Sequence, residues 1–295
     1  MVAPAGPVNP GRFRRGIALL GAHYQVRVPT DIARSDGYLA GTDDERAAEI
    51  DRMLRDPDVR AIIVARGGYG VLRLLPRLDP EPLRRDPKPI VGFSDATALL
   101  AWAEHAGVRG VHGPVASQLG DLPPEDLAAL VGVLGGATPG VLPAPLTPIG
   151  APRPSPGPLE GVLRGGNLTL LTHLIGTPWQ VTSAGTLMLL EEVGEKPYAI
   201  DRYLTHLHLA GALGGVAGAV VGDLTRCTDP PRPARAPDDP APAMAVVAER
   251  LRAAGIAGGR GAPVGHGRRN RALPWGARTV LHDDGRLEVL EPATR

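Results

Sequence analysis

The sequence contains little cysteine, few aromatic side chains and almost no lysine. Cys227 is the only cysteine among 295 residues, which excludes an internal disulfide and a metal site built from several thiolates. Aromatic residues make up 3% of the chain and lysine occurs only at positions 88 and 196, whereas alanine, glycine, proline and arginine are abundant. We interpret this bias as the codon usage of a GC-rich genome.

The chain also lacks an excess of one charge and a long apolar run. Its 32 basic and 31 acidic residues leave a net charge of +1, so no basic surface for nucleic acid is indicated. Runs such as LTLLTHLIG are too short to span a bilayer, and the arginines near the start precede no secretory signal. We therefore expect a cytoplasmic protein that binds neither nucleic acid nor membranes, and whose partner is a small molecule or a peptide.

Hydrophobic residues, at 43% of the chain, are spread along its whole length and indicate a globular protein of two domains. Apolar strands without alternation are typical of a parallel sheet covered on both faces, so residues 1–134 are predicted to form a doubly wound α/β domain. The expected strands are the end of 17–28, then 61–65, 89–93 and 108–113, and the expected helices are 41–56 with Thr42 as N-cap and Glu45 at N3, 70–79, and 96–107 closed by Gly107.

The second domain is predicted to follow a linker at 135–158, where proline and glycine are too dense for a regular element. Residues 159–295 then contain mixed strands and helices. We expect a turn and helix from 161 to 176, strands at 185–193, 216–224 and 262–267, helices at 199–211 and 245–255, a proline-rich loop at 228–243, and a final hairpin within 277–291.

The segment GFSDA (92–96) places Ser94 between a buried strand and a helix. Small neighbours two residues before and after a nucleophile allow such a sharp turn, so Ser94 is a candidate nucleophile. The backbone N–H of Asp95, at the start of the helix, would face an oxyanion formed on an attacked carbonyl. The alternative is that Ser94 or Asp95 only caps the helix.

The segment RGGYG (66–70) also follows a strand and opens a helix. Paired glycines allow the backbone to approach a ligand, but neither a Walker lysine nor a ribose-binding acid accompanies them, so a nucleotide phosphate is not supported. The motif is either a tight turn that needs glycine or a source of an oxyanion donor from Gly68.

Two further segments contain candidates for acid–base chemistry. Glu191 ends the apolar strand in LLEEVGEKPYAIDR and could orient a histidine, with Glu192, on the opposite face, as the second choice. His266 lies between two glycines in a loop and is a better acid–base candidate than the histidines within expected strands or helices, which are His23, His105, His206 and His208. No clustered spacing of metal ligands occurs, so we expect no metal and no other cofactor.

Six ordered blocks resemble the L,D-carboxypeptidases, the muramoyltetrapeptide carboxypeptidases that also include the microcin C immunity peptidases. The resemblance covers nearly the whole chain and implies a flavodoxin-like N-terminal domain plus a smaller, β-rich, swivelling C-terminal domain. The blocks are GTDDERAAEIDRMLRDPDVRAIIVARGGYGVLRLLPRLD, KPIVGFSDATALL, HGP, GGNLTLLTHLIGTP, LLEEVGEKPYAIDRYL and GHGRRNRALPWG.

The resemblance implies a serine peptidase with Ser94 as nucleophile and Glu191 and His266 completing the triad. It implies an oxyanion hole from the backbone of Asp95 and a glycine such as Gly68, and a homodimer. The implied reaction cleaves the terminal D-alanine from a murein tetrapeptide during peptidoglycan recycling. The expected substrate-binding residues, with either arginine able to hold the terminal carboxylate, are Arg66, Arg164, Asn167 and Trp275.

Two alternatives stay open. A microcin C immunity-type peptidase would hydrolyse the amide of a peptidyl or aminoacyl nucleotide, with Trp275 stacking on the base. A non-catalytic ligand-binding protein would have the same two domains but would need no triad.

The chain departs from the family at its start, MVAPAGP, with Ala5 where a serine often stands. We therefore expect a true start upstream of Met1. Without the family's full first strand, a position in the sheet would be left incomplete and backbone groups unpaired.

Overall fold

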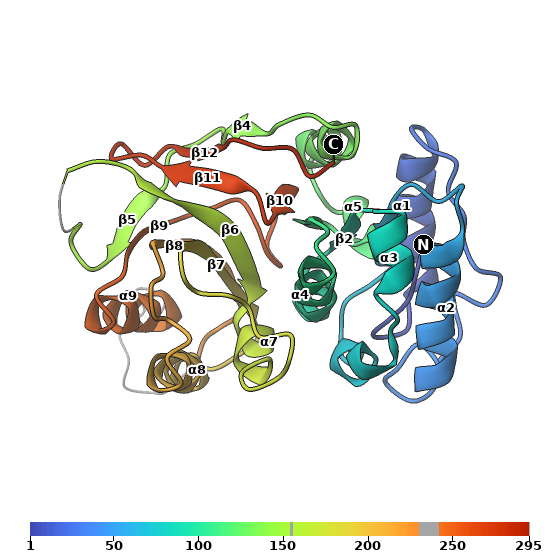
Figure 1. Cartoon of the computed structure of the whole chain (residues 1–295), viewed down its shortest axis with the longest axis horizontal. Helices are drawn as coiled ribbons and strands as arrows, with labels where there is room; N and C mark the ends of the chain where they lie inside the picture. The colour runs from blue at the N-terminus through green and yellow to red at the C-terminus, as the bar shows by residue number, and fades with distance from the viewer. Residues whose placement is uncertain (154–155, 230–241, 295) are drawn as a thin grey trace. The chain divides into compact units, whose positions relative to one another are not determined.

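The computed structural model describes residues 1–153, 156–229 and 242–294, and the chain divides into two compact units. The first unit comprises Met1–Thr138 together with Arg268–Gly276 and Pro292–Arg295, and the second comprises Pro139–Gly267 and Ala277–Glu291. Neither unit is one continuous stretch, because the end of the chain returns to the first unit twice. Figure 1 shows the elements of both units by label.

The sheet of the first unit has the order β1-β2-β3-β10, with β1 to β3 parallel and β10 antiparallel to β3. All residues of the four strands are buried, and for β1 to β3 this confirms the prediction from their unbroken apolar pattern. The strands are β1 (Ile62–Ile63), β2 (Ile90–Gly92), β3 (Gly110–His112) and β10 (Leu273–Trp275). The last of these was not expected, since 273–275 lies in a sequence rich in turn formers.

The first residues of the chain occupy the position beside β1, so the expectation of an incomplete sheet there is wrong. Val2 forms a parallel bridge with Val64, and its N–H donates to the carbonyl of Ile63 at 3.1 Å. The ammonium group of Met1 also donates to the carbonyl of Arg27 at 2.8 Å. The backbone groups at this position are therefore paired, as buried groups must be.

The helices of the first unit are α1 (Pro10–Gly21), α2 (Asp43–Arg55), α3 (Glu81–Arg85), α4 (Thr97–His105), α5 (Ala116–Leu119) and α6 (Pro124–Leu134), with 3₁₀ turns η1 (Val71–Arg73), η2 (Leu75–Arg77) and η3 (Ser94–Ala96). The capping box of Thr42 and Glu45 at the start of α2 is confirmed. The helix expected over 70–79 is wrong. Because Pro76 cannot donate a backbone hydrogen bond, two 3₁₀ turns form there instead of a continuous α-helix. No strand follows α1 within 17–28.

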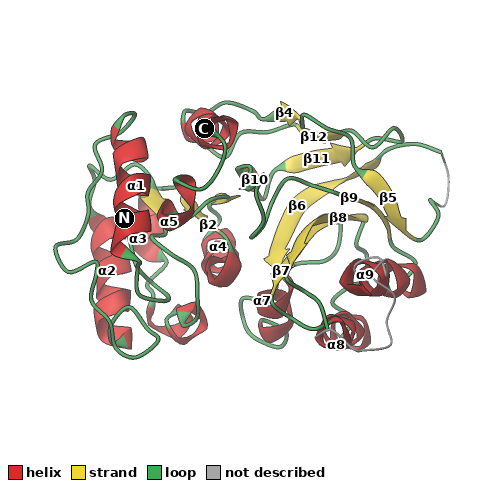
Figure 2. Cartoon of the chain, turned by 180° about the vertical axis from the view of Figure 1, so that it is seen from behind, coloured by secondary structure: helices red, strands yellow, loops and turns green. Residues whose placement is uncertain are grey.

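The second unit is built on an eight-stranded sheet with the order β4-β12-β11-β6-β7-β8-β9-β5. Strands β6 to β9 are parallel neighbours, and one helix connects each consecutive pair. Because such crossovers are almost always right-handed, helices α7, α8 and α9 lie on the same side of the sheet (Figure 2). The elements are β4 (Gly140–Val141), β5 (Thr147–Gly150), β6 (Leu159–Asn167), α7 (Leu168–His173), β7 (Thr186–Val193), α8 (Pro197–Leu209), β8 (Gly218–Thr225), α9 (Pro242–Ala253), β9 (Ala257–Arg260), β11 (Arg278–Leu281) and β12 (Leu287–Val289).

Three expectations for this part of the chain are wrong. The supposed linker contains β4 and β5, and the turn expected at 161–167 is the end of β6, because neighbouring strands supply the hydrogen bonds that local sequence does not favour. Pro148 is tolerated because β5 is an edge strand. The strand expected at 262–267 is a loop after β9. Most of the predicted loop at 228–243 lies outside the described residues.

Within the described residues, the helices are too short or too polar to cross a bilayer.

Candidate active site

Ser94 lies on a strained turn at the carboxyl end of β2. Its φ of 61° is in the left-handed region, where residues with a side chain are rare outside functional or tightly constrained sites. Gly92 allows this turn to pack, because a Cβ at Gly92 would lie 2.7 Å from the Cβ of Ala96. The small residues on both sides of Ser94 therefore have the role that the sequence predicted, in a 3₁₀ turn that leads directly into α4.

The RGGYG turn follows β1 and lies against Ser94. A Cβ at Gly67 would be 3.0 Å from the Cβ of Ser94 and 3.1 Å from its Oγ. Gly68 has a φ of 128°, and a Cβ there would lie 3.1 Å from the backbone nitrogen of Gly6. The two motifs thus meet at the carboxyl ends of neighbouring parallel strands, where open α/β sheets bind their ligands.

The Asp95 side chain joins these two turns. Its Oδ2 accepts a hydrogen bond of 2.9 Å from the backbone N–H of Val71, which follows the RGGYG turn. Burial raises the pKa of Asp95 to about 6, although the Val71 N–H and the Arg46 guanidinium lower it. The backbone N–H of Asp95 belongs to the first turn of η3, where N–H groups have no intrahelical acceptor, so it can donate to an oxyanion.

Arg46 holds the RGGYG turn from the side of α2 and was not singled out by the sequence analysis. Its side chain is completely buried, and it donates to the carbonyls of Gly70 and Gly41 at 3.1 Å each. It also pairs with Asp43. The sequence signal that could have identified Arg46 is its place on the buried face of an amphipathic helix. Charged side chains are buried only when they are paired, so an arginine there indicates a specific set of partners.

The second unit brings Glu191 and His266 together. Oε2 of Glu191 lies 2.7 Å from Nδ1 of His266, and the side chains are 0% and 18% exposed. A buried carboxylate in this place holds the proton on Nδ1, so Nε2 is the ring nitrogen that can accept a proton. Within the described residues, Oε1 of Glu191 has no hydrogen-bond partner. The pair has the geometry of the base and orienting acid of a triad.

Glu192 has a different environment although it is the next residue. Its carboxylate accepts hydrogen bonds from Asn167 Nδ2 at 3.1 Å, from the N–H and Oγ1 of Thr169 at 2.8 Å each, and from the Val193 N–H at 2.8 Å. Burial raises the pKa of Glu192, and the bonds from Val193 and Thr169 lower it. Glu192 therefore fastens the start of α7 to β7, and the geometry favours Glu191 as the partner of His266.

The expected substrate-binding residues are spread over both units. Arg66 is exposed and donates to the Pro7 carbonyl at 2.6 Å, and Arg164 is half-buried on β6 with Nη1 at 3.2 Å from Thr186 Oγ1. Asn167 is 3% exposed and serves as the N-cap of α7. Trp275 is 1% exposed on β10, and a ring buried to this degree offers no open face to a base.

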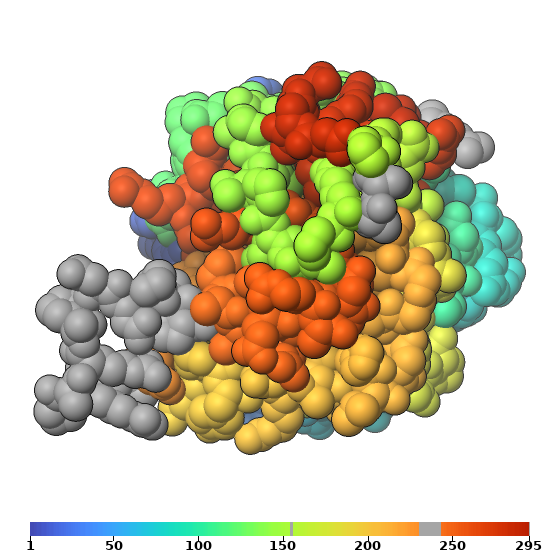
Figure 3. Space-filling model, turned by 90° about the vertical axis from the view of Figure 1, so that its left-hand side faces the viewer, coloured from blue at the N-terminus to red at the C-terminus, as the bar shows by residue number. Residues whose placement is uncertain are grey.

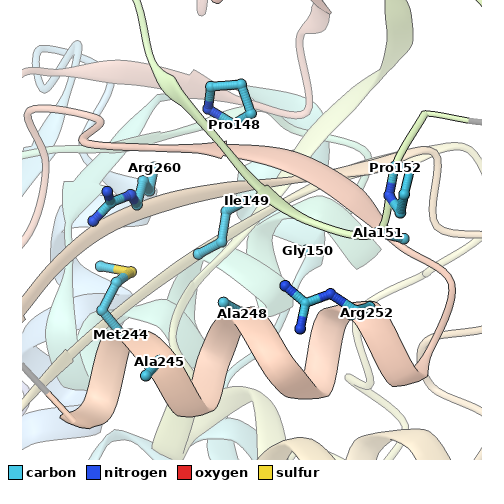
Figure 4. A pocket seen from close by; sticks show the side chains of 10 residues that line it. All are labelled: Pro148, Ile149, Gly150, Ala151, Pro152, Met244, Ala245, Ala248, Arg252 and Arg260. Atoms are coloured by element: carbon cyan, nitrogen blue, oxygen red, sulfur yellow. The ribbon is translucent and has the colours of Figure 1, made fainter.

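A groove in the second unit is a separate feature. It has a volume of about 590 Å³ and lies between β5 and α9, lined largely by apolar side chains with Arg252 and Arg260 (Figure 4). In the space-filling view, α9 is at the surface beside α8 and β5 (Figure 3). The groove contains none of the candidate catalytic residues and no nucleophile or base. Among the described residues, no three His, Cys, Asp or Glu side chains are grouped to hold a metal ion.

Comparison with known proteins gives two family matches along the chain. Residues 1–113 match the LD-carboxypeptidase N-terminal domain and residues 160–281 match the LD-carboxypeptidase C-terminal domain. The chain is 33% identical over 296 residues to the probable murein peptide carboxypeptidase of Bacillus subtilis (strain 168), covering 99% of this chain and 90% of that protein.

Several solved structures are similar over almost the whole chain. The muramoyltetrapeptide carboxypeptidase from Oxalobacter formigenes has a TM-score of 0.79 at 29% identity, covering 98% of this chain and 97% of that one. The microcin C7 self-immunity protein MccF, bound to glutamyl sulfamoyl guanosine, has a TM-score of 0.85 at 23% identity, covering 100% and 96%. At that identity the second likeness shows the fold alone. With both domain matches and a relative along its full length, the chain belongs to the LD-carboxypeptidase family.

Proposed function

We propose that this chain is a metal-independent serine carboxypeptidase that releases the terminal D-alanine from a murein tetrapeptide in peptidoglycan recycling. The observation that carries the proposal is the 2.7 Å contact between Glu191 and His266. The strained turn at Ser94 and the names of the relatives, a murein peptide carboxypeptidase and a muramoyltetrapeptide carboxypeptidase, support it further. We also propose that the protein acts in the cytoplasm as a homodimer, in line with the family resemblance.

In the proposed mechanism, Oγ of Ser94 attacks the carbonyl carbon of the residue before D-alanine while Nε2 of His266 takes the hydroxyl proton. Glu191 stabilises the resulting imidazolium. Backbone N–H groups of Asp95 and Gly68 donate to the oxyanion. When the tetrahedral intermediate collapses, the C–N bond breaks, and His266 gives its proton to the amine of the leaving D-alanine. A water molecule then hydrolyses the acyl-enzyme by the reverse proton route.

The proposed substrate places a D-alanine carboxylate and methyl group next to the scissile carbonyl. An L-alanine epimer exchanges those two groups, and a displacement of about 1 Å at the reacting carbon can cost ~100-fold in rate. The bond that breaks joins the L-centre of diaminopimelate or lysine to D-alanine. Arg66 and Arg164 are the candidates for binding the terminal carboxylate, because a guanidinium forms a two-pronged contact with it.

The test is incubation with a murein tetrapeptide ending in D-alanine, with its L-alanine epimer and with an aminoacyl sulfamoyl nucleoside, followed by mass spectrometry of the products. We expect release of alanine from the D-epimer at least about 100-fold faster than from the L-epimer. A Ser94→Ala variant should lose about 10⁴-fold in turnover. Hydrolysis of the nucleoside alone would favour the immunity-type reaction, and binding without any turnover would favour a ligand-binding protein.

A further inference from the structure

Asp223 lies next to the Glu191–His266 pair, yet neither the triad nor the oxyanion hole uses it. It is on β8, where the pairing with β7 shifts in register between Leu190 and Glu192. Such an irregularity adds a residue to one strand and redirects its side chains, and it is common beside active sites. In this case the additional residue is in β8, opposite Glu191, so the irregularity is at the level of the catalytic carboxylate.

The loop that carries His266 contacts Asp223 on both sides of the histidine. Before the histidine, the backbone N–H of Asp223 donates to the Val264 carbonyl at 3.0 Å, and a Cβ at Gly265 would be 3.2 Å from the Cβ of Asp223. After it, the Asp223 carboxylate lies against Gly267, whose backbone N–H lowers the pKa of that carboxyl. Asp223 therefore holds the loop immediately before and immediately after His266.

The contact with Asp223 is important because the local sequence of the His266 loop does not favour a single conformation. Both neighbours of His266 are glycines, and Gly265 has a φ of 120°, a conformation that residues with a side chain rarely adopt. Glycine loses more conformational entropy on ordering than any other residue, so a glycine-flanked loop needs tertiary contacts to stay in one position. At Gly267 the contact is close: a Cβ there would be 2.0 Å from Oδ2 of Asp223.

We propose that Asp223 is a positioning residue for the general base, which fixes the His266 loop through the hydrogen bond of its carboxylate with the Gly267 N–H. This inference rests on the proposed role of His266. The effect on kcat is assigned to the hydrogen-bond acceptor and not to the charge of Asp223. Burial raises the pKa of this half-buried carboxyl, and the Gly267 N–H lowers it. Loss of the acceptor should reduce kcat and leave KM nearly unchanged, because the proposed role of Asp223 is to position the base and not to bind the substrate.

The first arm of the test compares Asp223→Ala with Asp223→Asn, whose amide oxygen can still accept the Gly267 hydrogen bond. We expect kcat to fall about 10- to 100-fold in the alanine variant and less than about fivefold in the asparagine variant, with KM within about threefold in both. Asp284→Ala is the matched control, because Asp284 also accepts a backbone N–H, that of Arg286 at 3.1 Å, in a hairpin of the same unit. It should behave as the wild type.

The second arm approaches the contact from the loop. Gly267→Ala keeps Asp223 but places a methyl group against its carboxylate, so it should lower kcat by a similar factor. In the double variant with Asp223→Ala the clash is gone, and the two effects should not add. This arm also remains informative if Asp223→Ala fails to fold. Additive losses would overturn the proposal.

A readout that does not depend on turnover keeps this inference separate from the proposed function. The Nδ1 proton of a histidine bonded to a carboxylate gives a low-field NMR resonance, which should be sharp in the wild type and in Asp223→Asn and broadened or lost in Asp223→Ala. If the wild type releases no D-alanine, the proposed function fails while this arm still tests the contact. Unchanged resonance and unchanged kcat in Asp223→Ala, or equal damage from asparagine and alanine, would overturn the role.

Discussion

The Ser94 turn is built from residues a few positions apart, whereas the Glu191–His266 pair joins residues 75 positions apart in the sequence. The turn is defined by Gly92 and Ala96, which allow a strand to run directly into a helix. The pair depends on a strand end and on a glycine-flanked loop that is hydrogen-bonded to the irregular stretch of β8. The position of the proposed nucleophile is therefore a local property, whereas the positions of the proposed base and its acid depend on pairing across the whole second sheet.

The largest loss of kcat is expected when the proposed base in the second unit is removed. His266→Ala should lower kcat by about 10⁴-fold, because His266 is the proposed base that takes the serine proton. His206, exposed on α8, is the control, and His206→Ala should retain wild-type turnover of the tetrapeptide in the same assay. Equal losses in the two variants would mean that the choice among the histidines is unsupported.

The next effect distinguishes the two adjacent glutamates on β7. Glu191→Gln can still contact the imidazole but lacks the charge that stabilises its protonated form, so kcat should fall roughly 10³-fold with little change in KM. Glu192→Gln should instead lower the melting temperature, since Glu192 accepts several hydrogen bonds at the start of α7. Steady-state kinetics and thermal melts of both variants decide the matter, and a larger kinetic loss in the Glu192 variant would contradict this assignment.

A smaller effect tests the close packing at the Ser94 turn. Gly67→Ala places a Cβ 3.0 Å from the Cβ of Ser94, so the serine must shift, and we expect kcat to fall about 10- to 100-fold. Gly21→Ala is a matched control at the end of α1, where an added Cβ meets nothing within 4 Å. Turnover in Gly67→Ala equal to that of the control would show that the turn tolerates displacement.

The smallest effect on turnover is expected from Asp95→Asn, which should instead change the pH dependence of the free energy of unfolding. The pKa of Asp95 is raised to about 6 in the folded chain, so folding favours its protonated form, and its contribution to the free energy of unfolding falls as the pH rises from about 4 to about 6.

Asp95→Asn removes this titration but keeps an acceptor for the Val71 N–H. Relative to the wild type, the variant should therefore gain on the order of 3 kcal/mol of stability between pH 4 and pH 7.5. Denaturant unfolding of both proteins at the two pH values measures the gain. A stability difference that stays constant with pH would show that the Asp95 carboxyl does not titrate in this way.

The features that could be predicted from the sequence are those whose cause lies within a few residues. Unbroken apolar strands between helices predicted the buried parallel sheet, the capping box at Thr42 and Glu45 fixed the start of α2, and the small residues around Ser94 marked the turn. The strand ending at Glu191 and the glycines beside His266 marked both as candidates. Which of the two adjacent glutamates faces the histidine could only be ranked.

The features that depend on distant neighbours could not be predicted in this way and follow from the tertiary fold. Strands β4, β5 and β10 form in turn-rich sequence because adjacent strands supply their hydrogen bonds. Glu191 rather than Glu192 meets His266 because hydrogen bonds from Asn167 and Thr169 hold the Glu192 carboxylate on the α7 side. Asp223 contacts the His266 loop because pairing between β7 and β8 shifts in register there. Register and pairing are properties of the whole sheet, and no local pattern in the sequence encodes them.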